Sequence, residues 1–391
     1  MDKRFFGLDL HKKYATICGI SQQGEVVVKE DRLPLEQLPA WVADTLTGED
    51  AVALEASTNT WWAYDCLAVR AGRVVVVNPI KTRLIAQVRI NTDELSAEAL
   101  ARLLQSNFIC EVWVPEERTR RYRQVISHRI RLSQEGTRLK NRIHATLHRQ
   151  QIRSPYGNLF SRAGRAWLRR LELPELERLL LRQNLDLLES SEQALAEVDQ
   201  VLARLAQQDD RVPILMQIPG ISVFSALAIL AEIGEIGRFP SAKKLSSYAG
   251  LVPCLHRSGQ KHSSGGITKA GRSRLRWILV EAAHVAARHD PQLGRFYHRL
   301  RARKGTNVAV VATARKILVV IWHLLRGDGV YRGRQVQMIA GKFLEWGWKL
   351  GQKDRCASNK EFVLKQLQQI QINNLTHIRA GRRAYALRGP D

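Results

Sequence analysis

The sequence lacks an uninterrupted apolar run of 18 or more residues, so we expect no membrane span. Its first residues, MDKRFFGLDL, lack an apolar signal region followed by a small-residue cleavage site, which favours a cytoplasmic protein. The five cysteines are odd in number, far apart and without a C-x-x-C pair. This argues against a disulfide framework and against a zinc ribbon, and it favours free thiols in a reducing compartment.

Acidic residues are scarce beyond residue 115. The formal net charge is +24; residues 1–115 hold 12 Lys and Arg against 15 Asp and Glu, and residues 116–391 hold 49 against 22, a net of +27. A polyanionic partner explains this segregation, because each Lys or Arg placed on a phosphate releases a condensed counterion. We therefore expect a nucleic-acid partner. The alternatives are a basic protein that is merely soluble and one that binds anionic membrane.

Strand and helix patterns alternate in residues 1–115. Apolar runs at 4–10, 14–20 and 25–30 predict a three-stranded antiparallel meander. The pattern then predicts buried strands at 51–57 and 73–79, helices at 60–72 and 96–107, and a closing strand at 110–115. Ser96 is the predicted N-cap of the second helix. Strands interleaved with helices indicate an α/β domain with a mixed sheet.

Residues 116–211 have the composition of a basic helical region. Residues 118–150 contain ten Lys and Arg and one acid, with apolar residues three and four positions apart, which predicts a basic amphipathic helix. A second helix is predicted at 184–206 from leucines at a/d spacing, typical of a coiled coil. The two helices could form an antiparallel hairpin, or the second could pair with another subunit.

Residues 212–331 form a third predicted domain, mainly α-helical. An apolar helix follows the PGIS turn at 219–222, a polar loop spans 250–271, and two further helices are predicted at 272–289 and 307–326. The turn could present backbone N–H groups to a DNA phosphate, as in a helix-hairpin-helix, or be an ordinary helix entry. Residues 332–391 are expected to be a basic extension, helical in part, with a mobile end.

Three carboxylates are predicted at the ends of secondary structure elements. Asp9 ends the first strand, Glu55 ends a buried strand, and Asp93 lies in the loop before a helix. Strand ends of one sheet share an edge, so these carboxylates could converge, and a divalent cation would be needed to neutralise them. Mg²⁺ prefers such oxygen ligands and suits phosphodiester chemistry. The alternative is that each is an ordinary surface or capping acid.

A serine in the polar loop is a candidate nucleophile. Ser258 has Arg257, Lys261 and Lys269 near it in sequence. A serine that attacks a phosphate needs cations to hold the non-bridging oxygens. The alternative is a Ser-Gly turn whose basic residues contact a phosphate backbone, and Ser263 and Ser264 would serve equally well.

These pieces resemble the IS110/IS1111 family of insertion-sequence transposases, which is related to the Piv-type DNA invertases. The resemblance covers about residues 1–115 and 212–331, in the family's order. Three motifs lie in the N-terminal part, GLDLHKK (7–13), ALEAST (53–58) and NTDELSAEALA (91–101). Five lie in the C-terminal part, IPGIS (218–222), LAEIGEIGRF (230–239), AGLVPCLHRSG (249–259), ITKAGRSRLRWILVEAA (267–283) and ARKGTNVAVVATARKIL (302–318).

The resemblance implies a fold and a composite active site. Residues 1–115 would be a RuvC-like domain of the RNase H fold, with its metal set at Asp9, Glu55, Asp93 and the position of Ser96. The C-terminal domain would supply the nucleophile, Ser258, which would attack a phosphodiester beside the metal pocket and form a phosphoserine link.

The resemblance also implies partners. The family works as a homo-oligomer, a dimer or tetramer, and a noncoding bridge RNA chooses the donor and target DNA. The basic regions would then be the RNA- and DNA-binding surfaces. The residues we expect to bind nucleic acid are Arg257, Lys261, Lys269, Arg272, Arg274, Arg121, Arg129 and Lys140.

One departure from the family pattern concerns the metal set. The family has K-T-D-x-x-D-A where this chain has NTDELSA (91–97), so Ser96 replaces the fourth acid. Mg²⁺ can be held by fewer carboxylates together with water and substrate phosphates. Glu94 and Glu98 are near, but neither is expected on the face of Ser96, because only residues three and four apart align on a helix.

Three functions are consistent with the sequence. The first is an RNA-guided serine recombinase that uses Mg²⁺, and the same chemistry would serve site-specific inversion. The second is a RuvC-like junction nuclease that hydrolyses DNA with a metal-bound water and has no need of Ser258. The third is a nucleic-acid-binding relative in which Ser96 marks impaired catalysis.

Overall fold

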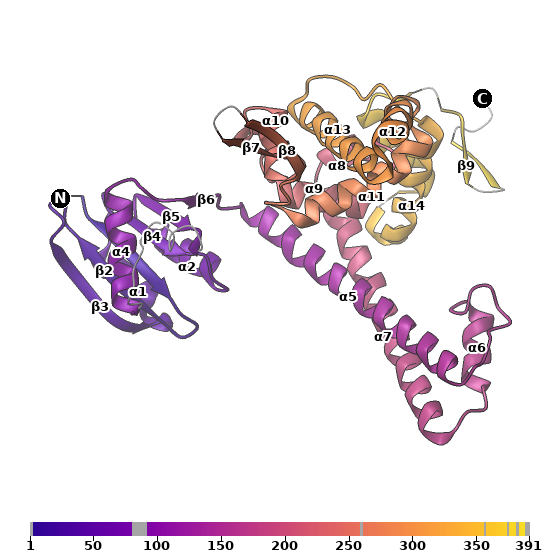
Figure 1. The fold of residues 1–391 in the computed structure, drawn as a ribbon, viewed down its shortest axis with the longest axis horizontal. Coiled ribbons are helices and arrows are strands. Elements are labelled where there is room, and N and C mark those ends of the chain that lie inside the picture. Colours follow the sequence, from indigo (N-terminus) through magenta and orange to yellow (C-terminus); the bar gives the residue numbers. More distant parts are fainter. Residues whose placement is uncertain are drawn as a thin grey trace. The chain divides into compact units, whose positions relative to one another are not determined.

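The computed structural model describes residues 3–79, 92–258, 261–355, 357–373, 375–380 and 383–387 of the chain. The chain folds into two compact units, Met1–Pro115 and Glu116–Asp391, which we name unit 1 and unit 2 and describe separately. Unit 1 is a sheet with helices, and unit 2 is mostly helical (Figure 1). The division falls where the charge of the sequence changes.

Unit 1 is built on a six-stranded mixed sheet of order β3-β2-β1-β4-β5-β6. Its strands are β1 (Phe5–Leu10), β2 (Tyr14–Ile20), β3 (Val26–Pro34), β4 (Ala51–Glu55), β5 (Arg73–Val77) and β6 (Glu111–Val112). The first three form an antiparallel meander, β4 and β5 run parallel to β1, and β6 is antiparallel to β5. The predicted meander and mixed sheet are confirmed.

Helices cover both faces of this sheet. Because successive residues of a strand point to opposite faces, Ala53 packs with Leu100 on one side, whereas Val52 and Leu54 belong to the core on the other. The first side is covered by α4 and the second by a 3₁₀ turn and two short helices. Their bounds are α4 (Asp93–Gln105), η1 (Leu35–Gln37), α1 (Leu38–Thr45) and α2 (Thr60–Leu67). The helix α1 was not predicted from the sequence.

The start of α4 differs from the sequence prediction, which placed the N-cap at Ser96. The N-cap is Thr92, whose side chain accepts a hydrogen bond from the Leu95 N–H at 3.3 Å. Asp93 and the neighbouring Glu94 then occupy the first turn, where the helix dipole favours negative charge. Ser96 therefore lies inside the helix, and its N–H donates to the Thr92 carbonyl oxygen at 3.0 Å.

Two long antiparallel helices dominate the first part of unit 2. They are α5 (Glu117–Arg149) and α7 (Glu175–Gln207), and the short helix α6 (Arg162–Arg170) lies in the connection between them. Arg149 pairs with Glu177 near one end, and Tyr122 donates to Asp209 at the other, so α5 and α7 run in opposite directions. The hairpin alternative is confirmed, and α7 begins nine residues earlier than predicted.

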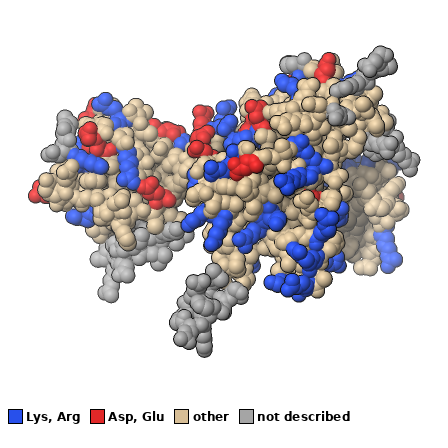
Figure 2. All heavy atoms as spheres, turned by 90° about the horizontal axis from the view of Figure 1, so that it is seen from above, with Lys and Arg blue, Asp and Glu red and all other residues tan. Residues whose placement is uncertain are grey.

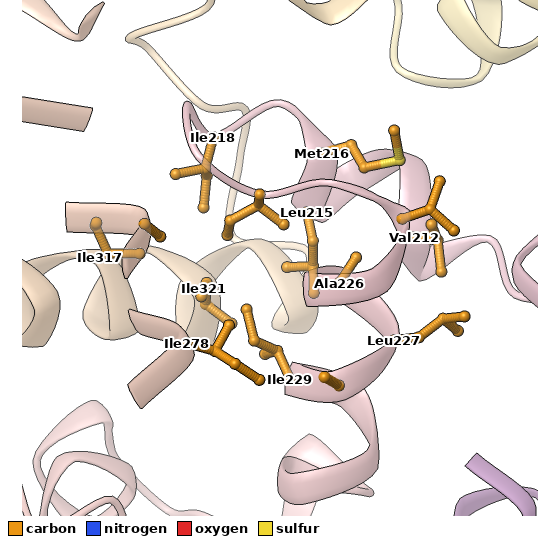
Figure 3. Packing of buried hydrophobic residues seen from close by; sticks show 14 of the residues in the cluster. Val212, Leu215, Met216, Ile218, Ala226, Leu227, Ile229, Ile278, Ile317 and Ile321 are labelled. Carbon is orange, nitrogen blue, oxygen red and sulfur yellow. The ribbon is translucent and has the colours of Figure 1, made fainter. Parts of the chain in front are cut away.

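The remainder of unit 2 packs around one core. Its helices are α8 (Arg211–Met216), α9 (Val223–Ile233), η2 (Ile236–Arg238), α10 (Ala242–Tyr248), α11 (Ser273–His289), α12 (Pro291–Lys304), α13 (Thr306–Arg326), α14 (Val336–Arg355) and α15 (Asn359–Gln369). Figure 3 shows Leu215 and Ile229 of this core beside Ile317 and Ile321 of α13. The core also includes residues of α5, α7, α14 and α15, so the three segments expected within 116–391 share it.

Two segments expected to lack strands contain hairpins. The polar loop at 250–271 includes β7 (Pro253–Ser258) and β8 (Lys261–Ile267), which pair antiparallel. The C-terminal tail includes β9 (His377–Ala380) and β10 (Arg383–Ala386), which also pair antiparallel. The prediction of a loop was wrong for β7 and β8, because Gly, Ser and basic residues do not show the apolar alternation from which strands are recognised. The tail was expected to be helical in part with a mobile end; two helices confirm the helical part, and its hairpin was not predicted.

One described helix, α13, is long and apolar enough to cross a membrane by length and composition. The same composition is found in core helices of globular proteins. Ile317, Leu318 and Ile321 of α13 are fully buried in the core of unit 2. We therefore interpret α13 as a core helix.

Candidate active site

Asp9 and Glu55 lie at the ends of two neighbouring parallel strands. Leu8 of β1 pairs with Leu54 of β4, and each acid is the next residue along its strand. Residues at the same level of adjacent parallel strands point to the same face. Asp9 shares its face with Gly7, and Glu55 shares its face with Ala53. Both carboxylates therefore leave the sheet on the side covered by α4.

A close approach of α4 to β1 brings Asp93 to the same place. A Cβ on Gly7 would come 2.0 Å from the carbonyl oxygen of Ala97, so only glycine leaves room for the helix there. Asp93 lies one turn before Ala97, and Asp9 lies two residues after Gly7. The strand and the helix run in opposite directions, so this contact places the two acids side by side.

The structure adds His11 to the predicted set. The donor atoms of Asp9, His11 and Asp93 all lie within 4.8 Å of one another. His11 Nε2 is 3.5 Å from Asp9 Oδ2 and 3.3 Å from Asp93 Oδ2. Sequence reasoning missed this histidine, although its place two residues after Asp9 in GLDLHKK was a signal that could have found it.

Tyr14 and Asn59 hold the histidine in this position. The Tyr14 ring stacks on His11 with centroids 4.6 Å apart and planes 20° apart. The Tyr14 hydroxyl donates to Asp93 Oδ2 at 3.1 Å, and this hydrogen bond raises the pKa of Tyr14. Asn59 Nδ2 donates to the His11 carbonyl oxygen at 2.9 Å, which fixes the backbone just beyond β1.

The fourth position of the expected metal set carries a hydroxyl. Ser96 is half-buried on α4, three residues after Asp93 and one turn before Leu100, which packs against β4. The two nearby acids do not replace it. Glu94 pairs with Lys29 at 2.7 Å and Glu98 pairs with Arg102 at 2.7 Å, so both are engaged elsewhere.

This donor set fits a divalent cation. Two carboxylates meet within 4.8 Å, with Glu55 on the same face of the sheet, and converging negative charge favours a bound cation. Oxygen donors are the ligands that Mg²⁺ prefers, and it needs only one or two carboxylates when water and substrate phosphates complete its shell. The residues that could hold the ion are Asp9, Asp93 and Glu55.

The predicted nucleophile lies at the tip of a hairpin in unit 2. Ser258 is the last residue of β7 and faces Lys261, the first residue of β8, across the ladder. Arg257 faces His262 in the same register. The side chains at 255–258 and 261–264, and residues 259–260 altogether, lie outside the described residues. The register alone places a serine and two basic residues at the adjoining ends of β7 and β8.

Four of the other basic residues predicted to bind nucleic acid fall into two groups. Arg129 is 20% exposed and donates to Asp199 at 2.8 Å, and Lys140 pairs with Glu192 at 3.1 Å, so both bridge α5 and α7. Arg121 is largely exposed on α5, and Lys269 is exposed in the loop before α11. Arg121 and Lys269 are therefore more accessible to a phosphate than Arg129 and Lys140.

Arg272 and Arg274 belong to a cluster at the start of α11. Arg272 Nε donates to the Tyr248 hydroxyl at 2.8 Å and lies 3.6 Å from Glu232. Arg274 lies 3.4 Å from the same buried carboxylate. Arg123 from α5 is nearby, and burial together with the positive charge of Arg272 lowers its pKa. Lys and Arg outnumber acidic residues over unit 2 on the face shown in Figure 2.

The chain is similar to known transposases over most of its length. Residues 212–298 match the family described as "Transposase IS116/IS110/IS902 family", and residues 6–151 match a second family described as "Transposase". A transposase for insertion sequence element IS1111A from Coxiella burnetii is 27% identical, over 85% of this chain and 92% of that protein.

Two further relatives widen the comparison. A probable family 20 transposase from Pseudomonas aeruginosa is 25% identical over 83% of this chain and 98% of that protein. A pilin gene-inverting protein from Moraxella bovis is 34% identical, over 30% of this chain and 37% of that protein. The similarity therefore includes both transposition and inversion proteins.

Proposed function

Because the chain belongs to the IS110 family of transposases, we propose that it cuts and rejoins DNA strands through a phosphoserine intermediate at Ser258. The observation that carries the proposal is the close approach of Asp9, near the end of β1, to Asp93, the first residue of α4. An acidic pocket of this kind suits phosphodiester chemistry. The pairing of Ser258 with Lys261 at a hairpin tip supports the second half of the site.

We assign unit 1 to the RuvC-like, RNase H type of fold as part of this proposal. An antiparallel meander followed by two strands parallel to its first strand supports this assignment. The placement of acids at the ends of β1 and β4 and at the start of α4 supports it further.

The proposed chemistry begins with attack of Ser258 Oγ on a DNA phosphorus atom. The new Oγ–P bond replaces the bond from phosphorus to the leaving deoxyribose oxygen, and the serine proton ends on that oxygen. Nearby cations such as Arg257 and Lys261 would hold the non-bridging oxygens as charge develops. Attack by the hydroxyl of another strand reverses the exchange and frees the serine, so the phosphodiester energy is conserved.

The acidic pocket of unit 1 would supply metal-assisted chemistry on DNA phosphate. Asp9, Asp93 and Glu55 would hold Mg²⁺, which as a Lewis acid neutralises charge on phosphate oxygens when bound. The position of Ser96 leaves this pocket one carboxylate short of the family pattern. The alternative is that the pocket binds the ion weakly. The protein would then bind nucleic acid but exchange strands poorly.

The remaining features of the proposal concern partners. The net charge of +27 on residues 116–391 supports binding of donor and target DNA and of a noncoding bridge RNA that selects them. We expect a homo-oligomer, a dimer or tetramer, acting in the cytoplasm. Inversion of a DNA segment is a second candidate function, favoured by the similarity to the pilin gene-inverting protein.

The test supplies the gene with its native flanking DNA and a target plasmid in cells, and sequences new junctions. Ser258→Ala should abolish strand transfer and the covalent protein–DNA adduct while nucleic-acid binding persists. Ser263→Ala in the neighbouring strand is the matched control and should keep both. Junctions formed by Ser258→Ala at the parental rate would refute Ser258 as the nucleophile. Junctions formed at that rate by Ser263→Ala and Ser264→Ala as well would favour hydrolysis by a junction nuclease.

A further inference from the structure

We propose that His11 is a nitrogen ligand of the cation in the acidic pocket and shifts its preference from Mg²⁺ towards Mn²⁺. This inference rests on the proposed function, since it concerns the same pocket. It goes beyond the expected ligand set, which contains only oxygen donors.

The first argument is the separation of the donor atoms. Two ligands about 2.1 Å from one ion and at right angles are about 3.0 Å apart in an octahedral shell. His11 Nε2 is 3.3 Å from Asp93 Oδ2 and 3.5 Å from Asp9 Oδ2. The nitrogen and the two oxygens therefore already stand close to the spacing of neighbouring ligands of one ion.

The second argument concerns the state of the nitrogen. The imidazole is 35% exposed as a whole, but Nε2 itself is shielded from solvent and makes no hydrogen bond within the described part of the chain. A buried polar atom without a hydrogen bond is unfavourable, so such atoms call for an explanation. The two carboxylate oxygens lie 3.3 and 3.5 Å from Nε2, and a cation between the three atoms would give this nitrogen a closer partner.

The third argument is the support behind the ring. Metal-binding histidines are held by neighbours that fix the ring orientation. Here Tyr14 stacks on the imidazole and donates to Asp93 Oδ2, so one side chain orients two of the ligands. The Asn59 hydrogen bond to the His11 carbonyl fixes the backbone. The nitrogen is thus presented to the pocket in a prearranged geometry.

The chemical consequence follows from the donor types. Mg²⁺ is a hard ion that favours oxygen and dehydrates reluctantly. Mn²⁺ also suits carboxylate and water ligands, and as a first-row transition ion it accepts an imidazole beside them, although more weakly than the later ions of the series. In this chain a hydroxyl at Ser96 has replaced a carboxylate, and a neutral nitrogen at His11 adds a donor without negative charge. A pocket with one carboxylate fewer and one imidazole nitrogen more should therefore bind Mn²⁺ in preference to Mg²⁺.

The test uses the full chain loaded with Mn²⁺ and pulsed electron paramagnetic resonance, which detects coupling from a directly bound ¹⁴N. The parent protein should show this coupling. His11→Gln should lose the coupling and bind Mn²⁺ about tenfold more weakly, a loss of affinity at the lower end of that seen when the residues around a bound metal are changed. His11→Asp should also lose the coupling, but it should bind Mg²⁺ more tightly than the parent. Lys12→Gln, at the next and exposed position, is the control and should change neither.

Three other outcomes have distinct meanings. Bound Mn²⁺ without ¹⁴N coupling in the parent protein overturns the proposal. Tighter Mn²⁺ binding by His11→Gln also overturns it, because the histidine would then act as a competing counter-charge to the carboxylates. If Asp9→Asn binds Mn²⁺ as well as the parent, the acidic pocket itself is refuted, and with it that part of the proposed function.

Discussion

Gly7 of β1 and Ala97 of α4 are in such close contact that a Cβ on the glycine would lie 2.0 Å from the alanine carbonyl oxygen. The contact sets how far α4 stands from the sheet. Asp9 and Asp93 lie together beyond one end of this contact, two residues along the strand from Gly7 and one turn along the helix from Ala97. The spacing of the two carboxylates therefore depends on a residue that has no functional group.

Substitution of Gly7 by alanine should displace α4. The added methyl group meets backbone atoms that cannot rotate away, so we expect the free energy of unfolding to fall by about 1–3 kcal/mol. Mn²⁺ or Mg²⁺ affinity should fall with it, because Asp93 moves away from Asp9. Urea denaturation and calorimetric titration measure the two effects. Gly48→Ala is the control, since a Cβ there meets nothing within 4 Å.

Ser96→Asp should strengthen the acidic pocket. The new carboxylate would lie three residues after Asp93 on the face of α4 that packs against the sheet, and it would add a fourth negative donor. Calorimetry should show tighter Mg²⁺ binding, and junction sequencing should show more recombination. Ser96→Asn has nearly the same shape without the charge and should do neither. Equal Mg²⁺ affinity in all three proteins would contradict the assignment of this position.

Asp199 should matter to the stability of the α5–α7 hairpin. It accepts from Arg129 at 2.8 Å, and both side chains are about four-fifths buried. Asp199→Asn leaves that guanidinium without its charged partner, and we expect a loss of about 1–3 kcal/mol in the free energy of unfolding. Asp186→Asn on the same helix is the control, because its exposed pair should contribute under about 1 kcal/mol.

The same pair bears on nucleic-acid binding. Arg129 was expected from the sequence to contact nucleic acid, whereas in the structure it bridges two helices. We expect Arg129→Gln to destabilise the hairpin with little change in nucleic-acid affinity, and Arg121→Gln, on the exposed side of α5, to show the reverse. Filter binding over a range of salt concentrations separates them, because each lost phosphate contact lowers the slope of log affinity against log salt by about one.

Lys342 should make stability depend on pH. Its Nζ donates to the carbonyl oxygens of Met216 and Ile218 at 2.8 and 2.7 Å, and burial lowers its pKa to about 7. An unfolded lysine has a pKa of about 10.4, so between these values the unfolded chain binds more protons and stability rises with pH. The difference in unfolding free energy between the parent and Lys342→Met should therefore grow from pH 6 to pH 9. The exposed Lys365→Met should show no such trend.

Regular elements with strong periodicity could be predicted from the sequence. The three-stranded meander, β4 and β5, and the helices α5, α11 and α13 were confirmed within a few residues. Each carries a local apolar pattern that only one kind of element satisfies. The β7–β8 hairpin and α1 were not predicted. The β7–β8 segment shows little apolar alternation, whereas α1 has Leu38, Trp41 and Val42 at helical spacing, a signal that could have predicted it.

The candidate site was only partly predictable. Asp9, Glu55 and Asp93 were predicted from their places at element ends and from a family resemblance, and the structure brings Asp9 and Asp93 together. His11 was missed because only the carboxylates were considered, although it follows Asp9 by two residues in GLDLHKK. The assignment of Ser96 as an N-cap was wrong, because Thr92 caps the helix one turn earlier.

The sequence by itself determined the segregation of charge, the alternation of strands and helices before residue 115, and the presence of acids at strand ends. These properties are local, so they are legible in the order of residues. Only the tertiary structure decided which candidate metal-binding side chains lie together and which basic side chains are paired. Gly7 allows α4 to pack closely on the sheet, Tyr14 stacks on His11, and Arg129 forms an ion pair with Asp199. Such contacts join residues distant in sequence, and close packing of the folded chain decides them.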